Sequence, residues 1–334
     1  MQGGAAQQRH TPVMLSRCVE LLTEATASVS RTGRTPVVID ATLGMGGHTQ
    51  ALLEADGSLH VLGIDRDPQA LNLAGERLGE YGTRFSSVRA VYDQVGEIAE
   101  TLPADSALAG VLFDLGVSSL QLDEPERGFA YSYDAPLDMR MDAAADSTDP
   151  TAAELLAEVS EARLKEILKH YGEERFAARI ATRIVEARAH RPITTTAQLA
   201  DIVDRAVPAA AKRTGGHPAK RTFQALRIAV NRELDVLERA IPAACDVVDV
   251  AGRVVVLSYH SLEDRIVKRA FTERTRSSAP AGLPVELQEH KPTFRSLTRG
   301  AERPTEDELT MNPRAASAKL RAAERIRPMT RSTS

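Results

Sequence analysis

Three glycines and an aspartate in the first part of the chain have the types and spacing of a ribose-binding site. Gly44, Gly46 and Gly47 follow an apolar, β-branched run at residues 37–39, and Asp65 ends the next apolar run. In nucleotide-binding βαβ units, an acidic residue about 20 positions past such glycines accepts hydrogen bonds from ribose hydroxyls. These residues therefore predict a site for a ribose-bearing cofactor.

The glycine spacing narrows the choice of cofactor. The turn reads Gly-Met-Gly-Gly rather than the G-x-G-x-x-G of dinucleotide sites, which weakens the case for a bound pyrophosphate. S-adenosylmethionine fits better, because it carries adenosine and a zwitterionic tail but no phosphate. A nicotinamide-dependent oxidoreductase stays open as the rival enzyme, and a tight turn followed by a surface aspartate is the alternative without a ligand.

Other acidic or aromatic residues follow strands of the same kind. Asp40, Asp65, Tyr92 and Asp114 each stand at the end of a predicted strand. Parallel strands place their carboxyl ends at one edge of the sheet, where open α/β folds bind ligands. We therefore expect these side chains to converge, with the ring of Tyr92 able to stack on an adenine.

The elements that must position these residues alternate as in a Rossmann-like α/β sheet. The predicted strands are residues 37–40, 60–65, 85–92, 109–114 and 252–258, followed by 293–297 and 318–323. We expect the last two to pair antiparallel at a sheet edge. The helix predictions include a start at Ser16, a start at Asp67-Pro68, and one long helix over residues 222–246.

Residues 151–208 interrupt this alternation. They are rich in alanine and charge and have a 3.6-residue period, which predicts about four helices. We therefore expect a discontinuous cofactor-binding domain, residues 1–142 and 217–334, and an inserted helical domain, residues 143–216, that recognises the substrate.

Composition limits the classes of protein. The 334 residues are 43% apolar, and neither a secretory leader nor a run as long as a membrane span is visible, so we expect a globular, cytoplasmic protein without a membrane partner. Cys18 and Cys245 stand far apart with no Cys/His cluster, so we expect neither a disulfide framework nor a metal site.

Charge is unevenly distributed. Residues 1–204 carry 18 basic and 31 acidic side chains, whereas residues 205–334 carry 24 and 15, although the net charge is only −4. A basic C-terminal part favours a polyanionic partner such as RNA, while an ordinary solvated surface is the alternative. The expected phosphate contacts are Lys212, Arg213, Lys220, Arg221, Lys268 and Arg269.

Ten motifs follow one another along the chain. They are TLGMGGHT (42–49), GIDRDPQA (63–70), FDLGVSS (113–119), QLD (121–123), ERGF (126–129), PLDMRMD (136–142), YGEERF (171–176), RTFQALRI (221–228), SYHSLEDRIVKR (258–269) and NPRA (312–315). Together, in this order, they resemble the bacterial RsmH (MraW) family over residues 10–325. The mild departures are Tyr92, often Phe in the family, Leu120 where Pro is common, and Tyr259 where Phe is common.

The resemblance implies a class I methyltransferase sheet interrupted by a helical domain. It implies that S-adenosylmethionine is the methyl donor and that the substrate is the N4 amine of a cytidine in the decoding region of 16S ribosomal RNA, within the small ribosomal subunit. The oligomeric state is open, with a homodimer among the options. The cofactor-binding residues that the motifs imply are Gly46, Gly47, His48, Asp65, Tyr92, Asp114 and Gln121.

The chemistry also needs an acceptor for the cytosine amine, whose lone pair is delocalised into the ring. The acceptor must orient the amine toward the methyl group. Our catalytic candidates are Asp114, Asp138 and His260, with Ser118 weaker. Each has an alternative role: Asp114 in cofactor binding alone, Asp138 in a pair with an arginine, and His260 as a helix cap. A non-catalytic RNA-binding protein is the rival from another functional class.

Overall fold

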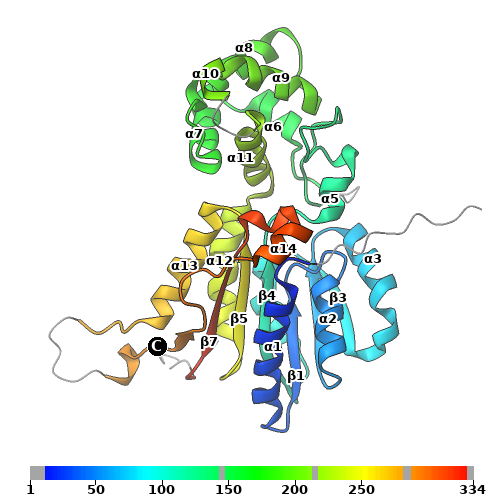
Figure 1. Ribbon diagram of the computed structural model, residues 1–334, viewed down its shortest axis with the longest axis vertical. Helices are drawn as coiled ribbons and strands as arrows, with labels where there is room; N and C mark the ends of the chain where they lie inside the picture. Colours follow the sequence, from blue (N-terminus) through cyan, green and yellow to red (C-terminus); the bar gives the residue numbers. More distant parts are fainter. Residues whose placement is uncertain (1–11, 143–146, 213–216, 281–286, 329–334) are drawn as a thin grey trace, which may run out of the picture. The chain divides into compact units, whose positions relative to one another are not determined.

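The protein is described from a computed structural model, which covers residues 12–142, 147–212, 217–280 and 287–328. It forms two compact units. Unit 1 comprises Met1–Gly116 and Val236–Ser334, and unit 2 comprises Val117–Asp235. Figure 1 shows the helices and strands of each unit.

Unit 1 is built on a seven-stranded sheet in the order β3-β2-β1-β4-β5-β7-β6. The strands are β1 Thr35–Asp40, β2 His60–Asp65, β3 Phe85–Arg89, β4 Ser106–Asp114, β5 Arg253–Ser258, β6 Phe294–Ser296 and β7 Lys319–Arg325. Strands β1 to β5 are parallel, and β7 runs antiparallel to both β5 and β6. The predicted Rossmann-like α/β fold and its antiparallel edge are therefore confirmed.

The middle of this sheet is buried on both faces. Val37, Val38 and Ile39 of β1 are at most 4% exposed, and every residue of β5 is buried. Continuous apolar, β-branched runs are what such central parallel strands require. The strand order changes direction between β1 and β4, so the carboxyl ends of these two strands flank the place where open α/β sheets bind ligands.

Helices cover the sheet of unit 1. They are α1 Leu15–Ser30, α2 Gly47–Ala55, α3 Pro68–Leu78, α4 Val95–Glu100, α13 Ser261–Thr275 and α14 Glu306–Met311, with short 3-10 turns η1 Gly79–Arg84, η2 Tyr92–Gln94, η4 Gln288–His290 and η5 Pro313–Ser317. Helix α1 packs on β1, β4 and β5 (Figure 1). Among the described residues, no helix combines the length and apolar character that crossing a bilayer demands.

Two helices begin at or near their predicted starts, and one predicted helix is divided in two. Asp67 caps α3 as predicted, since its side chain accepts the N–H of Gln69. Helix α1 begins at Leu15, one residue before the predicted Ser16, because Met14 turns the chain with φ 49°. The single helix expected over residues 222–246 is wrong. It is two helices, α11 Ala219–Asn231 and α12 Glu233–Val247, broken where Arg232 adopts φ 51°.

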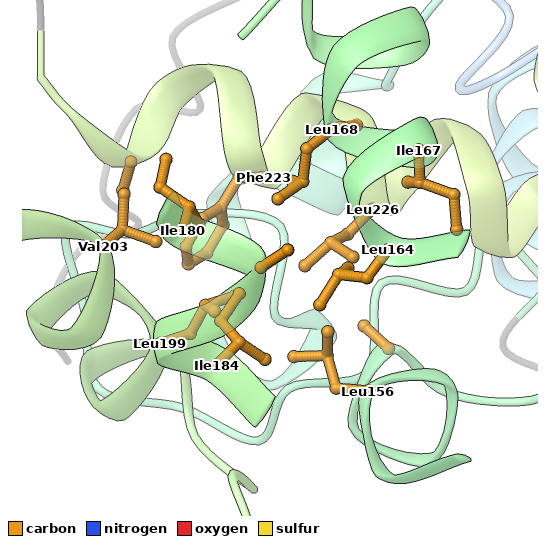
Figure 2. Packing of buried hydrophobic residues seen from close by; sticks show 14 of the residues in the cluster. Leu156, Leu164, Ile167, Leu168, Ile180, Ile184, Leu199, Val203, Phe223 and Leu226 are labelled. Carbon is orange, nitrogen blue, oxygen red and sulfur yellow. The ribbon is translucent and has the colours of Figure 1, made fainter. Parts of the chain in front are cut away.

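Unit 2 is a helical bundle. Its elements are α5 Ser119–Asp123, η3 Pro125–Arg127, α6 Ala152–Glu158, α7 Glu161–Gly172, α8 Ala177–His190, α9 Thr196–Ala206, α10 Ala209–Lys212 and α11. The helices expected between residues 151 and 208 are confirmed as α6 to α9, three of them started by the hydroxyl caps Thr151, Ser160 and Thr195. Their apolar faces form one core (Figure 2).

The helical unit extends beyond the expected residues 143–216 on both sides. Phe129, Leu137 and Met139 from the preceding loop are buried in the same core as Phe223 of α11. Asn231 joins the two flanks, since its amide donates to the Met139 carbonyl at 2.8 Å and accepts the Met141 N–H at 2.7 Å. Both flanks pack in this core, so the contacts place them in unit 2.

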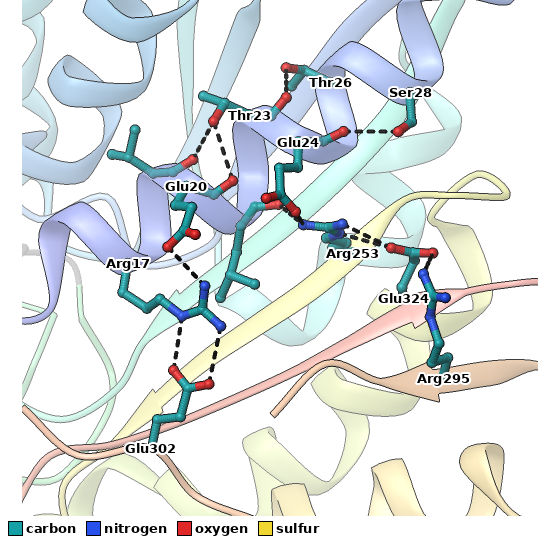
Figure 3. Close-up of polar contacts among 12 residues, drawn as sticks. Arg17, Glu20, Thr23, Glu24, Thr26, Ser28, Arg253, Arg295, Glu302 and Glu324 are labelled. Atoms are coloured by element: carbon teal, nitrogen blue, oxygen red, sulfur yellow. Dashed lines mark hydrogen bonds and ion pairs between the residues drawn. The ribbon is translucent and has the colours of Figure 1, made fainter. Parts of the chain in front are cut away.

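A buried arginine ties the first helix of unit 1 to its last strands. Arg253 is 8% exposed, and its guanidinium reaches Glu24 of α1 at 2.7 Å and Glu324 of β7 at 3.0 Å (Figure 3). It also donates to the Leu21 carbonyl. Arg295 pairs with the same Glu324. Burial leaves these groups dependent on one another for hydrogen bonds.

Arg253→Ala is expected to lower the free energy of unfolding by about 3 kcal/mol, because Glu324 and the Leu21 carbonyl lose a buried donor. Glu24→Ala serves as the control, since the side chain of Glu24 is 58% exposed and its loss should cost below about 1 kcal/mol. Urea unfolding measures both. Equal losses in the two variants would show that the arginine is no more than a surface partner.

Candidate active site

The turn after β1 is braced by a buried carboxylate. Asp40 is 1% exposed, accepts the Thr49 hydroxyl at 2.7 Å and accepts the Thr42 N–H at 3.3 Å. Burial raises the pKa of Asp40 above its ordinary value. Asp40 therefore points into the fold, where it fixes the start of α2.

The glycines of the turn are needed by the chain itself. A Cβ on Gly46, which has φ 76°, would lie 2.7 Å from Leu78, and one on Gly47 would lie 2.6 Å from Pro12. Gly44 has φ 51°, but a Cβ there would meet only one atom within 4 Å, the Thr42 carbonyl oxygen at 4.0 Å. The open side of the turn therefore lies at Gly44. Gly46 is required by its conformation and its packing, and Gly47 by its packing.

Asp65 is held against this turn. One carboxylate oxygen accepts the Gly44 N–H at 2.8 Å, and the other accepts the Asp67 N–H at 2.9 Å. Burial raises the pKa of Asp65 to about 6, although both backbone hydrogen bonds act in the opposite direction. A carboxylate offers about four acceptor positions, so two remain after these bonds. That number suits the two hydroxyls of a ribose.

Asp114, at the end of β4, lies on the other side of the turn. Its N–H donates to the Thr42 hydroxyl oxygen at 2.6 Å. One carboxylate oxygen accepts the hydroxyl of Tyr259 at 2.6 Å, and the other lies 3.7 Å from Nδ1 of His48. The imidazole of His48 is buried, with Nε2 3.2 Å from the Val13 carbonyl oxygen. A carbonyl can only accept, so Nε2 is the donor in that bond.

Tyr92 follows β3 and opens the short turn η2. Its ring packs edge to face on Phe113 of β4, with 5.8 Å between ring centroids. Because β3, β2, β1 and β4 are consecutive in the sheet, unit 1 brings Gly46, Gly47, His48, Asp65, Tyr92 and Asp114 to one edge. Asp65, Tyr92 and Asp114 therefore follow the expectation from the strand ends, whereas Asp40, which was expected to join them, points into the fold.

Three of the predicted residues belong to unit 2. Gln121 lies in α5, where its side-chain oxygen accepts the Ser118 N–H at 3.0 Å and its amide nitrogen donates to the Met141 carbonyl. Ser118 caps this helix, since its hydroxyl oxygen accepts the Gln121 N–H. Asp138 holds Arg140 through both carboxylate oxygens, each 2.8 Å from a guanidinium nitrogen. The arginine pair considered for Asp138 is therefore present, with Arg140 as partner.

His260 belongs to unit 1 and caps α13. Its Nδ1 accepts the Glu263 N–H at 3.4 Å, while the carboxylate of Glu263 accepts the N–H groups of Tyr259 and His260 at 2.7 and 3.1 Å. This arrangement is the capping role considered for His260.

His260→Ala is expected to lower the free energy of unfolding by about 1 kcal/mol, whereas His260→Asn should not, because asparagine also caps helices. Urea unfolding measures the difference. An asparagine variant as unstable as the alanine variant would contradict the capping role. Turnover of the asparagine variant, compared with the parent at equal folded fraction, then reports whether the imidazole has a chemical role as well.

The expected phosphate contacts are divided between the units. Lys220 and Arg221 are exposed on α11, and Lys268 and Arg269 are exposed on α13. Arg269 pairs with Glu238 at 2.7 Å, and Arg221 donates to the Glu173 carbonyl at 3.3 Å. The Lys212 side chain and Arg213 lie outside the described residues.

No role was predicted for Tyr259, which contacts Asp114, or for Thr42. Tyr259 directly follows β5, the strand beside β4. The rule that ligand-edge residues follow parallel strands would have identified it, had it been applied to the last parallel strand as well as to the first four.

The chain is similar to a known protein family and to individual proteins. A family model described as "MraW methylase family" matches residues 7–326. The Kocuria rhizophila protein "Ribosomal RNA small subunit methyltransferase H" is 60% identical over 330 residues, 99% of this chain and 98% of that protein. A Thermobifida fusca protein of the same name is 56% identical over 97% of this chain and 96% of its own length. A SAM-dependent O-methyltransferase structure from Thermotoga maritima aligns with 97% of this chain and 70% of that chain, with 9% identity and a TM-score of 0.39.

Proposed function

Because the chain belongs to the MraW methylase family, we propose that it is an S-adenosylmethionine-dependent methyltransferase. Its proposed substrate is the N4 amine of a cytidine in the decoding region of 16S ribosomal RNA, presented within the small ribosomal subunit. The structural observation that supports this most is the link from the glycine turn to Asp65 through the Gly44 N–H. This link joins the ends of two adjacent strands into one acceptor site.

The residues of unit 1 fit the proposed cofactor. Asp65 would hold the ribose hydroxyls with its two remaining acceptor positions, and the ring of Tyr92 would pack on the adenine. Asp114 supplies a fixed negative charge on the other side of the turn. When bound, S-adenosylmethionine supplies a methyl group on a positively charged sulfur. Gln121, in unit 2, is the remaining proposed contact.

The protein must also make the cytosine amine reactive. A side chain that accepts a hydrogen bond from the amine favours a pyramidal nitrogen and directs its lone pair, so positioning supplies part of the barrier reduction. We propose Asp138 as this acceptor, with Asp114 and His260 as the other candidates. The bidentate Arg140 pair holds the Asp138 carboxylate in one orientation.

Unit 2 is proposed to recognise the RNA. A base buried in ribosomal RNA must be unstacked before its amine can react, so nearby phosphates have to be gripped. The exposed Lys220 and Arg221 begin α11 of this unit, and Lys268 and Arg269 provide exposed charge on unit 1. We also propose that the reaction takes place in the cytoplasm, because the proposed substrate is there.

Isothermal titration with S-adenosylmethionine and, separately, with NAD tests the cofactor. We expect saturable binding of S-adenosylmethionine and none of NAD, because the turn lacks the G-x-G-x-x-G spacing that a pyrophosphate needs. Binding of NAD alone would instead support an oxidoreductase that uses Asp65 for a nicotinamide nucleotide.

A further inference from the structure

A tyrosine hydroxyl occupies one side of the Asp114 carboxylate. Tyr259 follows β5, and its hydroxyl donates to Asp114 at 2.6 Å. Burial and the neighbouring carboxylate raise the pKa of Tyr259 well above its ordinary value. The hydroxyl is therefore protonated at neutral pH. It donates a short, charge-assisted hydrogen bond to one oxygen of Asp114.

The rest of Asp114 is held as well. Its second carboxylate oxygen faces Nδ1 of His48 at 3.7 Å, and its N–H donates to Thr42 at 2.6 Å. His48 is itself fixed by the Val13 carbonyl. The side chain thus has a defined orientation before any ligand arrives, which lowers the entropy that binding must remove.

Tyr259 is suited to act as a fixed donor. Its N–H donates to the buried carboxylate of Glu263 at 2.7 Å, and its ring packs against the apolar core of unit 1. The ring also lies beside Gly116, where an added Cβ would be 3.5 Å away. The hydrogen bond of its N–H and the packing of its ring hold Tyr259 beside Asp114.

This geometry suits Asp114 to the cofactor-binding role considered for it. A carboxylate held in one orientation presents its negative charge in a fixed direction, which favours a cationic or hydroxyl-bearing part of a ligand.

We propose that Tyr259 is a positioning residue for cofactor binding, whose hydroxyl orients the Asp114 carboxylate toward S-adenosylmethionine. This proposal rests on the proposed function. It assigns the hydroxyl of Tyr259 to cofactor affinity.

Tyr259→Phe tests the proposal, because it removes only the hydroxyl. The Kd for S-adenosylmethionine, measured by isothermal titration without RNA, should rise roughly tenfold, since a hydrogen bond to a charged group is lost. Turnover at saturating cofactor, and its pH profile, should stay within about twofold of the parent. Tyr81→Phe is the matched control, as Tyr81 donates to Glu54 at 3.2 Å elsewhere in the same unit, and its Kd should equal that of the parent.

A double variant shows whether the Tyr259 hydroxyl acts through Asp114. If the hydroxyl acts through Asp114, the Kd of the Asp114→Ala variant should not rise further when Tyr259→Phe is added. An unchanged Kd in Tyr259→Phe, additive losses in the double variant, or a fall in turnover at saturation with an unchanged Kd would each overturn the proposal. Thermal melts of all variants identify any loss of folding. A parent that does not bind S-adenosylmethionine would refute the proposed function itself.

Discussion

Asp138→Ala is expected to reduce methyl transfer by about a hundredfold to ten-thousandfold while leaving the Kd for S-adenosylmethionine within about twofold of the parent. The size follows from what a positioned acceptor contributes to the reaction of a weak nucleophile. The retained affinity follows because the proposed cofactor site lies in unit 1, apart from Gln121, whereas Asp138 belongs to unit 2. Single-turnover transfer of a labelled methyl group and isothermal titration measure the two quantities.

Arg140→Ala separates chemistry from structure. Asp138 holds Arg140 through both carboxylate oxygens, and this contact raises the pKa of Arg140. If Asp138 serves only to hold this arginine, the two alanine variants should be equally impaired. We expect Asp138→Ala to be the more impaired by at least about tenfold, because it removes the acceptor itself. Turnover of Asp138→Ala at the parent rate would remove Asp138 from the mechanism.

Asp65→Ala is expected to raise the Kd for S-adenosylmethionine by about a hundredfold, because two hydroxyl partners lose a charged acceptor. The parent should also lose affinity in acid. With the pKa of Asp65 near 6, about nine-tenths of these carboxyl groups are protonated at pH 5, so affinity should fall about tenfold between pH 7 and pH 5. Asp65→Asn should bind weakly with no such pH dependence, as titration across this range would show.

The sign of the stability effect is opposite to that of the affinity effect. Folding raises the pKa of Asp65, so the folded protein holds a proton that the unfolded chain releases near pH 4. This bound proton stabilises the folded state, and the stabilisation is lost as the pH rises through about 6. At pH 7 the unbound protein therefore carries an unfavourable buried charge. In Asp65→Asn the free energy of unfolding should therefore not fall between about pH 4 and pH 6 as it does in the parent, because asparagine does not titrate. Urea unfolding at several pH values measures this, and a variant with the same fall as the parent would mean that another group causes it.

The strands and the residues at their ends were predictable from sequence because both depend on local patterns. A β-branched run predicts a buried strand, and parallel strands share an edge, so Asp65 and Asp114 could be assigned to that edge from sequence alone. The start of α3 at Asp67-Pro68 was also predictable, since a cap and a first-turn proline act within a few residues.

The features that sequence did not predict depend on contacts between distant residues. The helical unit includes Phe129 and Phe223 because both side chains fill its core, which no local pattern reveals. The break at Arg232 follows Asn231, and neither a glycine nor a proline stands beside it to mark the end of a helix. The packing of Gly46 on Leu78 likewise joins parts of the chain that are far apart in sequence, so these glycines appeared to serve a ligand alone.

The central claim is that this protein methylates a cytidine amine in the small-subunit RNA, and nucleoside mass mapping tests it most directly. Small ribosomal subunits from a strain lacking this gene would be incubated with the purified protein and S-adenosylmethionine carrying a labelled methyl group. We predict that one decoding-region cytidine is unmodified at N4 beforehand and carries the label afterwards. A decoding region already modified in the deletion strain, or label on another position, would contradict the claim and favour a non-catalytic or different RNA-binding role.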